Sequence, residues 1–165
     1  MGGSRIRMPM RIEINNRQAR VAVNPDRIRA LLRFLMDQAC QLDPDRRWAE
    51  VSLTVLDDPA ITQLKGQWFD RFVTTDVITF TSPPVVKSSG WTGEILVNAP
   101  QAVREGGRRK TGVQFELALY IAHGCDHLMD QSDRTAAGRK RMRQRECEWL
   151  RLAEKAGWVR GLIGI

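Results

Sequence analysis

The order of strand-like and helix-like patterns along the chain constrains its fold more than any other feature. Four short stretches have the alternation or β-branched composition of strands, and they lie at residues 10–15, 51–56, 75–81 and 93–98. Apolar residues at helical spacing predict helices at 25–41, from 57 to 68, from 99 to 106, at 114–129 and at 135–156. This order predicts an α+β fold, a single domain in which a mixed four-stranded sheet is packed with about five helices.

Smaller signals refine this outline. Residues 1–9 read as a disordered start, so we expect one domain over 10–160, which suits a chain of 165 residues. Residues 20–23 are a candidate for a short partner strand. Residues 82–92, rich in Pro, Ser and Gly, predict a loop. The adjacent glycines Gly106 and Gly107 are expected to end a helix.

Composition narrows the choice of partners. The chain has 26 Lys and Arg against 19 Asp and Glu, a net charge of +7, which favours a polyanionic partner such as nucleic acid or an anionic membrane surface. A solvated basic surface without a specific partner is the alternative. Three widely spaced cysteines do not form a disulfide framework and fit a reducing cytoplasm. No stretch approaches the ~20 apolar residues of a membrane span, so no membrane partner is expected.

The chemistry of the chain is concentrated in one short segment. Both of its histidines, His123 and His127, lie there, four residues apart on a predicted helix in the C-terminal half. That spacing places both imidazoles on one helix face, where both can reach one ion. The alternative is a pair of ordinary helix histidines, one of them buried and hydrogen-bonded.

A third ligand would come from the aspartates that follow. Asp130 could share the face of the histidines if the helix continues, and Asp133 could curl back if the helix breaks first. The residues alone therefore predict one ion, zinc or another divalent transition metal, on His123, His127 and either Asp130 or Asp133. A metalloprotease of the HExxH type is disfavoured, because Gly124 stands where that motif has its glutamate.

Three blocks of the sequence resemble the YbeY family of rRNA maturation factors. The segment from His123 to Met129, with Asp133 six residues after His127, resembles the family's HGxLHLxGyDH signature, in which three histidines hold zinc. TDVITF at 75–80 resembles its TDVLSF block, and GEI at 93–95 its glycine-acid-isoleucine strand. The order and spacing of the blocks match, and the resemblance covers roughly residues 50–150.

The resemblance implies a metal-dependent, single-strand-specific endoribonuclease that acts on ribosomal RNA in the cytoplasm and takes part in ribosome assembly. It also reveals two departures. The family's third histidine falls on Asp133, and an arginine before the second block falls on Phe69, with Arg71 as a candidate replacement. Because of these departures, a second hypothesis stays open, in which the protein is a non-catalytic RNA- or ribosome-binding assembly factor that keeps a structural metal.

A metal hydrolase of this kind lowers the pKa of a bound water and needs a cation to stabilise the phosphoryl oxygens, for which Arg71 is our catalytic candidate. Basic residues crowd the segment 134–160, where Lys and Arg outnumber Glu, and suit contacts with RNA phosphates. Of the tryptophans, Trp68 and Trp149 are predicted to lie in the core, and Trp91 is the better candidate for stacking on a base.

Overall fold

The computed structural model describes residues 9–86 and 88–164, and within them the chain folds as one four-stranded mixed sheet. The strands are β1 (Arg11–Asn16), β2 (Trp48–Leu56), β3 (Val77–Ser82) and β4 (Trp91–Asn98). Their order is β1-β2-β4-β3; β1, β2 and β4 are parallel, and β3 pairs with β4 in the antiparallel direction at one edge. The predicted mixed sheet is confirmed.

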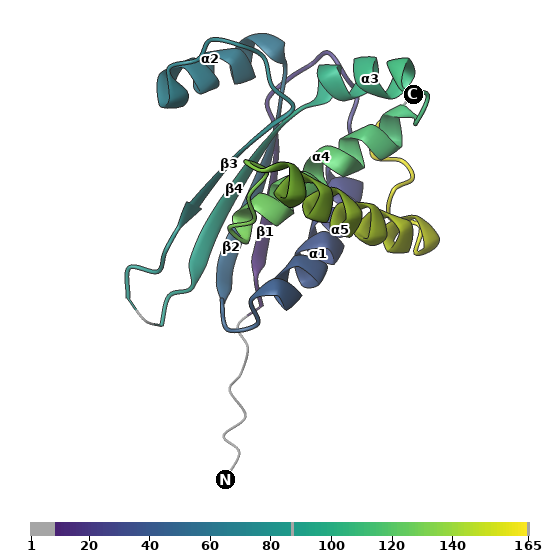
Figure 1. Cartoon of the computed structure of the whole chain (residues 1–165). Helices are drawn as coiled ribbons and strands as arrows, with labels where there is room; N and C mark the ends of the chain where they lie inside the picture. The colour runs from purple at the N-terminus through teal and green to yellow at the C-terminus, as the bar shows by residue number, and fades with distance from the viewer. Residues whose placement is uncertain (1–8, 87, 165) are drawn as a thin grey trace.

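Five α-helices accompany the sheet in the described residues. They are α1 (Pro25–Ala39), followed by the 3-10 turn η1 (Cys40–Leu42), then α2 (Asp58–Phe69), α3 (Ala99–Arg108), α4 (Val113–Leu128) and α5 (Ala136–Lys155). In Figure 1, α1, α4 and α5 form a layer on one side of the sheet, and α2 lies apart from it at the top of the view. The predicted single-domain α+β fold is therefore confirmed.

Helix α4 is the centre of this architecture. It contacts β3 and β4 on one side and α1, α3 and α5 on others, so most of its side chains are buried. Its mean hydropathy is correspondingly high for a helix, because little of its surface faces water. Gly124 lets it approach the sheet closely, since a Cβ there would lie 2.8 Å from Ile95 Cγ2. The helix that carries both histidines is thus enclosed by the sheet and by three other helices.

Residues 20–23 do not form the candidate partner strand. Val23 makes only an isolated bridge with Ile163. The reason is local, because the Gln18 side chain takes up the backbone groups that a strand would pair. Its Oε1 accepts hydrogen bonds from the N–H groups of Arg20 and Val21, and its Nε2 donates to the carbonyl of Val21.

Helix α3 does not stop at its two glycines but continues through them to Arg108. Gly106 is buried against the start of α4, where an added Cβ would lie 2.8 Å from the carbonyl oxygen of Gly112. The glycine therefore permits the close approach of two helices and does not end the first one.

Two of the three tryptophans with a predicted location lie elsewhere in the structure. Trp149 is buried in the core, as predicted. Trp68 is 66% exposed, so its predicted place in the core is wrong, because the end of α2 extends past the small cluster that holds this helix to the sheet. Trp91 belongs to β4, not to a loop, and the guanidinium of Arg46 lies over its ring, 4.1 Å from the centroid, where a base would have to stack.

Two sequence expectations concern the ends of the chain and its relation to membranes. The predicted disordered start falls almost wholly on residues 1–8, which lie outside the described residues, and the limits 10–160 stay a prediction. In the ranges 9–86 and 88–164, each helix is too short or too polar to cross a lipid bilayer.

One ion pair fixes the start of α2 to α3 and generates a prediction. Arg104 donates two hydrogen bonds to the Asp58 carboxylate, at 2.7 and 2.8 Å, and Asn98 donates a third at 2.8 Å. The hydrogen bonds from Arg104 lower the pKa of Asp58 below its ordinary value of 3.8, although burial opposes this. Because the folded-state pKa is the lower one, the stabilisation is complete above about pH 4 and is lost as the pH falls through the folded pKa.

We expect Arg104→Ala to lower the free energy of unfolding at neutral pH by about 1 kcal/mol, a value that allows for the partial exposure of the pair. Urea unfolding at pH 7 and pH 3 measures it, and the difference from the parent should shrink at the lower pH. Arg108→Ala, which removes an exposed pair on the same helix, is the control with little effect. Equal unfolding of Arg104→Ala and parent at pH 7 would contradict the assignment.

Candidate metal centre

The two histidines face one another across a single turn of α4. Their Nε2 atoms are 2.9 Å apart, and each side chain is 25% exposed. The helical spacing of four residues sets this proximity, as the sequence predicted.

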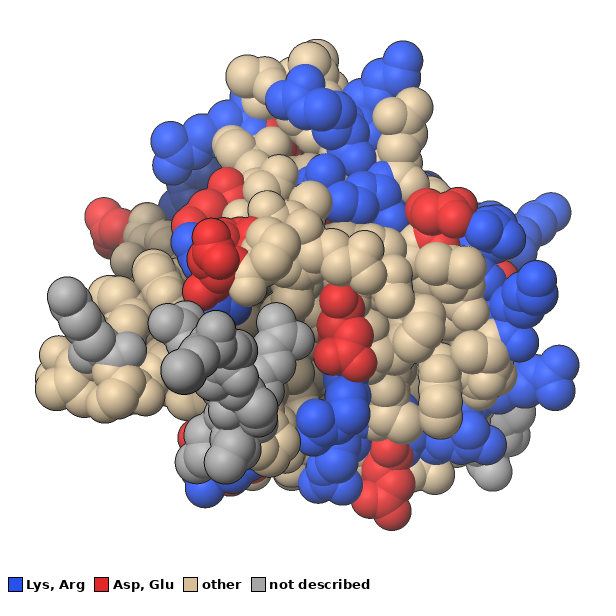
Figure 2. All heavy atoms as spheres, turned by 90° about the horizontal axis from the view of Figure 1, so that it is seen from below, with Lys and Arg blue, Asp and Glu red and all other residues tan. Residues whose placement is uncertain are grey.

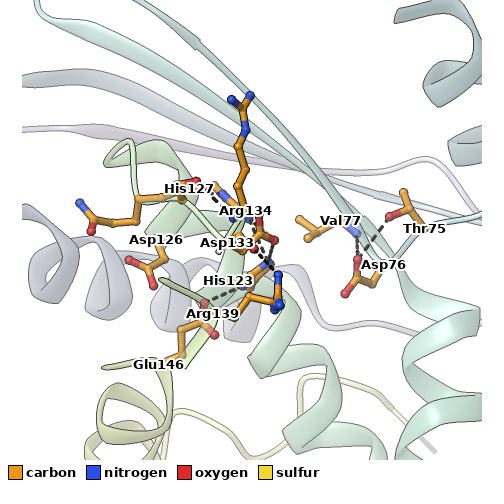
Figure 3. A network of polar contacts seen from close by, with 12 residues as sticks. Thr75, Asp76, Val77, His123, Asp126, His127, Asp133, Arg134, Arg139 and Glu146 are labelled. Atoms are coloured by element: carbon orange, nitrogen blue, oxygen red, sulfur yellow. Dashed lines mark hydrogen bonds and ion pairs between the residues drawn. The ribbon is translucent and has the colours of Figure 1, made fainter. Parts of the chain in front are cut away.

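The chain then turns back and adds a carboxylate. Helix α4 ends at Leu128, and Asp130 has a left-handed backbone with φ of 59° that reverses the chain. As a result, Asp133 Oδ2 lies 3.8 Å from His123 Nε2 and 3.6 Å from His127 Nε2. Figure 3 shows the Asp133 side chain beside both imidazoles. The three ligand atoms lie within 4.8 Å of one another.

The other two aspartates are held elsewhere. The Asp130 carboxylate accepts a 2.6 Å hydrogen bond from Arg46, whose guanidinium also donates to the carbonyl of Leu128. Asp126 is fully buried and paired with Arg145 at 2.7 Å. Of the two candidates, Asp130 and Asp133, the structure therefore brings only Asp133 to the histidines.

The hydrogen bonds of the outer imidazole nitrogens fit a cation between the inner ones. His127 Nδ1 lies 3.1 Å from the carbonyl oxygen of Gln131, which can only accept, so this nitrogen carries the proton. His123 Nδ1 lies 2.6 Å from the Glu146 carboxylate. With both protons on Nδ1, both Nε2 lone pairs point at each other and at a carboxylate oxygen, an arrangement that a cation would stabilise.

The spacing of the donor atoms also suits a metal ion. Ligands that bind one tetrahedral zinc ion at ~2.0–2.2 Å lie roughly 3.3–3.6 Å apart. The three separations here, 2.9, 3.6 and 3.8 Å, bracket that value. Two imidazoles and one carboxylate would leave a fourth position for water or substrate.

Burial and charge shift the pKa values of the two histidines in opposite directions. Burial alone would lower the pKa of His123, but the hydrogen bond and charge of Glu146 outweigh it, and the pKa is raised. The pKa of His127 is lowered, first by burial and then by the positive charge on His123. Burial also raises the pKa of Asp126 to about 6 against the opposing effect of Arg145, and the negative charge of Glu146 adds to the rise.

Glu146 is a site residue that sequence reasoning missed. It lies on α5, is buried to 3% exposure, and reaches His123 from the side opposite the other ligands. A signal for it is present in the sequence. Met142, Glu146, Trp149 and Leu150 form one buried stripe of α5, and a carboxylate within an apolar stripe requires a partner.

Two cavities meet at this group of ligand atoms. The first, of about 460 Å³, contains His123, Asp133 and Asp76, and four cations line it: Arg109, Arg139, Lys140 and Arg143. The second, of about 710 Å³, contains His127, Asp133, Phe69, Lys65 and Arg134. Positive charge is not confined to these cavities. Figure 2 shows Lys and Arg spread round the underside of the molecule, interrupted by acidic and uncharged side chains.

Two further residues near the site differ in their surroundings. Arg71, the candidate catalytic cation, is exposed in the segment between α2 and β3 and does not line either of these two cavities. Its catalytic role stays a prediction. Asp76 orders the turn directly before β3. Its Oδ1 accepts hydrogen bonds from the N–H of Val77 and the hydroxyl of Thr75, while the residue also lines the first cavity.

Comparison with known proteins assigns the family. The family model described as endoribonuclease YbeY matches residues 13–154, which run from within β1 to the last residue but one of α5. The chain belongs to the endoribonuclease YbeY family. The endoribonuclease YbeY of Moorella thermoacetica is 33% identical over 146 residues, which cover 83% of this chain and 93% of that protein. The endoribonuclease YbeY of Syntrophotalea carbinolica is 32% identical over 145 residues, 83% of this chain and 91% of that protein.

A solved structure has a fold similar to that of this chain. TM1509 from Thermotoga maritima, known from its solution structure, superposes with a TM-score of 0.56. It is 17% identical in sequence, and the match covers 91% of this chain and 95% of that one. At this identity the likeness concerns the fold alone. Membership of the YbeY family supports an endoribonuclease role, and with it an RNA substrate.

The choice between the two aspartates can be tested by metal content. If Asp133 is a ligand, Asp133→Ala should lose most of the transition metal that copurifies with the parent in the absence of chelators, as measured by elemental analysis. Asp130→Ala is the matched control and should keep its metal, because that carboxylate pairs with Arg46. Full metal content in Asp133→Ala, with loss in Asp130→Ala, would reverse the assignment.

The role of Glu146 can be tested separately. Because it fixes the proton and orientation of His123, Glu146→Ala should weaken metal affinity by about 10- to 100-fold, and Glu146→Gln, which keeps an acceptor oxygen, should weaken it less. Competition titration with a chromophoric chelator measures both. Glu148→Ala, exposed on the same helix, is the control. Equal affinities for parent and Glu146→Ala would remove Glu146 from the site.

Proposed function

We propose that this protein is a metal-dependent, single-strand-specific endoribonuclease that acts on ribosomal RNA during its maturation and during ribosome assembly in the cytoplasm. The observation that carries the proposal is the convergence of His123, His127 and Asp133 at the junction of two cavities, in a chain of the endoribonuclease YbeY family. The mixed nitrogen and oxygen donor set favours zinc, with another divalent transition metal as the alternative.

A divalent ion bound to these three side chains would lower the pKa of a water molecule and supply hydroxide near neutral pH. The residues of the chain have distinct tasks around it. Glu146 keeps a proton on His123 Nδ1, so that Nε2 is free to act as a ligand. Asp133 brings a negative charge where the family signature has a neutral histidine, which makes the ion less electrophilic and the water less acidic.

The cations of the first cavity suit the substrate. Arg139, Lys140 and Arg143 lie on α5 and face the cavity that contains His123 and Asp133. They can hold the phosphate that is cleaved and stabilise the charge that develops on its oxygens as the new P–O bond forms and the old one breaks. A cation at this place does what we expected of Arg71. Phosphate contacts of this kind bind RNA without reading its sequence and weaken with rising salt.

A second candidate function has a specific observation in its favour. Phe69, at the position of an arginine in the family pattern, lines the cavity beside His127 and Asp133 and brings no positive charge there. A protein with a weakened catalytic centre could still bind ribosomal RNA and serve as an assembly factor with a structural metal. Cleavage assays separate the two functions.

If the proposal holds, the full chain should cleave a single-stranded ribosomal RNA fragment, and a chelator should abolish the cleavage, with recovery on addition of zinc or another divalent transition metal. His123→Ala should remove the activity while the circular dichroism spectrum of its metal-free form still matches that of the metal-free parent, although loss of the partner of buried Glu146 should lower its melting temperature. Asp130→Ala should cleave like the parent. Gel analysis of end-labelled RNA measures all three.

Absence of cleavage with every divalent metal, together with salt-dependent binding to ribosomal RNA, would select the assembly factor instead. If the binding has no salt dependence, phosphate contacts do not supply the affinity, and the argument from the basic cavity fails for both functions.

A further inference from the structure

Two aromatic side chains at the end of α2 are exposed to an unusual degree. Trp68 is 66% and Phe69 is 51% exposed, and both pack against the ring of Phe80 on β3. The centroid of Phe80 lies 5.2 Å from that of Trp68 and 6.1 Å from that of Phe69, and the Phe69 ring is nearly parallel to it, at 11°. The three residues form a continuous apolar ledge, and large exposed apolar patches mark binding sites.

The backbone holds this ledge in place. Helix α2 ends at Asp70, which has a left-handed backbone with φ of 54° and an N–H bonded to the carbonyl of Gly66. The chain turns back there, and the ring of Phe72 covers Gly66 at the position that a Cβ would occupy. Phe72 therefore anchors the turn, although it is itself 62% exposed. Within the described residues, the turn leaves Trp68 and Phe69 facing outward, each more than half exposed.

The ledge adjoins the candidate metal centre. Phe69 lines the same cavity as His127 and Asp133. Two cations, Lys65 on α2 and Arg134 after α4, line that cavity as well. A ligand that fills this cavity therefore meets two candidate metal-binding side chains, two cations and the ring of Phe69.

We propose that Trp68 and Phe69 form a stacking platform for an unpaired RNA base next to the phosphate that is cleaved, an inference that rests on the proposed function. Nucleic acid has the matching chemistry, since each nucleotide carries a phosphate and a flat base that stacks on aromatic side chains. The bases of a duplex have both faces covered by their neighbours, so the platform selects single strands. It would also explain why an aromatic residue, Phe69, stands at the position where the family pattern has a cation.

RNA fits this surface better than a protein partner does. The ledge is continuous with a cavity that is lined by cations and by candidate metal-binding side chains, whereas protein interfaces are depleted of Lys. The exposed rings also lie beside the site where a phosphate must bind, which a docking surface for a protein would not require.

The test measures binding of fluorescently labelled single-stranded oligoribonucleotides, protected from cleavage by 2′-O-methyl groups, to the full metal-loaded chain by anisotropy, with gels to show that the RNA stays intact. A matched oligonucleotide has an abasic site at one position at a time. Trp68→Ala and Phe69→Ala should each weaken binding of the normal oligonucleotide by roughly 10-fold, in the range for the loss of one base stack. Trp68→Tyr and Phe69→Tyr, which keep a ring, should bind within about threefold of the parent.

Two controls make the outcome specific. Phe69→Leu keeps apolar surface but no ring and should behave like Phe69→Ala. Val85→Ala, at an exposed apolar residue in the segment between β3 and β4, should bind like the parent. With an abasic site at the stacked position, parent and Trp68→Ala should bind equally. The alanine variants replace exposed side chains, and unchanged thermal unfolding shows that they are folded.

Failure of the platform and failure of the proposed function give different results. If the parent cleaves and binds RNA, and the Ala and Leu variants bind as tightly as the parent, the platform is overturned and the nuclease stands. If Phe69→Leu binds like the parent while Phe69→Ala does not, apolar contact replaces stacking, and the platform is also overturned. If the parent neither binds nor cleaves RNA, the function fails and takes the platform with it.

Discussion

The buried hydrogen bond between His123 and Glu146 is the interaction on which the candidate site depends. At 2.6 Å it joins α4 to α5 and directs His123 Nε2 toward His127 and Asp133. The bond can form only because α4 is enclosed between the sheet and α5, where Gly124 lets it approach Ile95. The packing of α4 in the core therefore also determines where the ligand atoms of the candidate metal centre lie. A change in how α4 sits on the sheet would displace the ligand atoms together.

Much of this could be predicted from sequence, because it depends on local periodicity. The strands, the helices and the pairing of His123 with His127 follow from spacings of two and four residues. What could not be predicted depends on contacts between distant segments. Asp130 is held away from the histidines by its hydrogen bond with Arg46, a residue 84 positions away in the chain. Glu146 can be recognised as a site residue only when α5 is known to pack against α4. Trp68 follows the helical pattern of core residues, but no element of the described fold covers the end of α2.

The turn between α4 and α5 makes two sets of contacts near the candidate site. Gln131 offers its carbonyl to His127 Nδ1, and its side chain accepts a hydrogen bond from Arg145, the partner of buried Asp126. Asp126, which replaces an apolar residue of the family signature, is therefore part of a chain of contacts that ends at the imidazole of His127. The turn both reverses the backbone and sets the orientation of His127, so it has little freedom to vary.

The ligand atoms and the aromatic ledge come from separate parts of the chain. His123, His127, Asp133 and Glu146 belong to one stretch of α4 and α5, whereas Trp68, Phe69 and Phe80 belong to α2 and the edge strand β3. Substitutions in the second group leave the first intact. If Trp68 and Phe69 stack a base as proposed, natural selection could alter the choice of RNA there without replacing a ligand of the candidate metal centre, and homologues with the same ligands could diverge in the transcripts that they process.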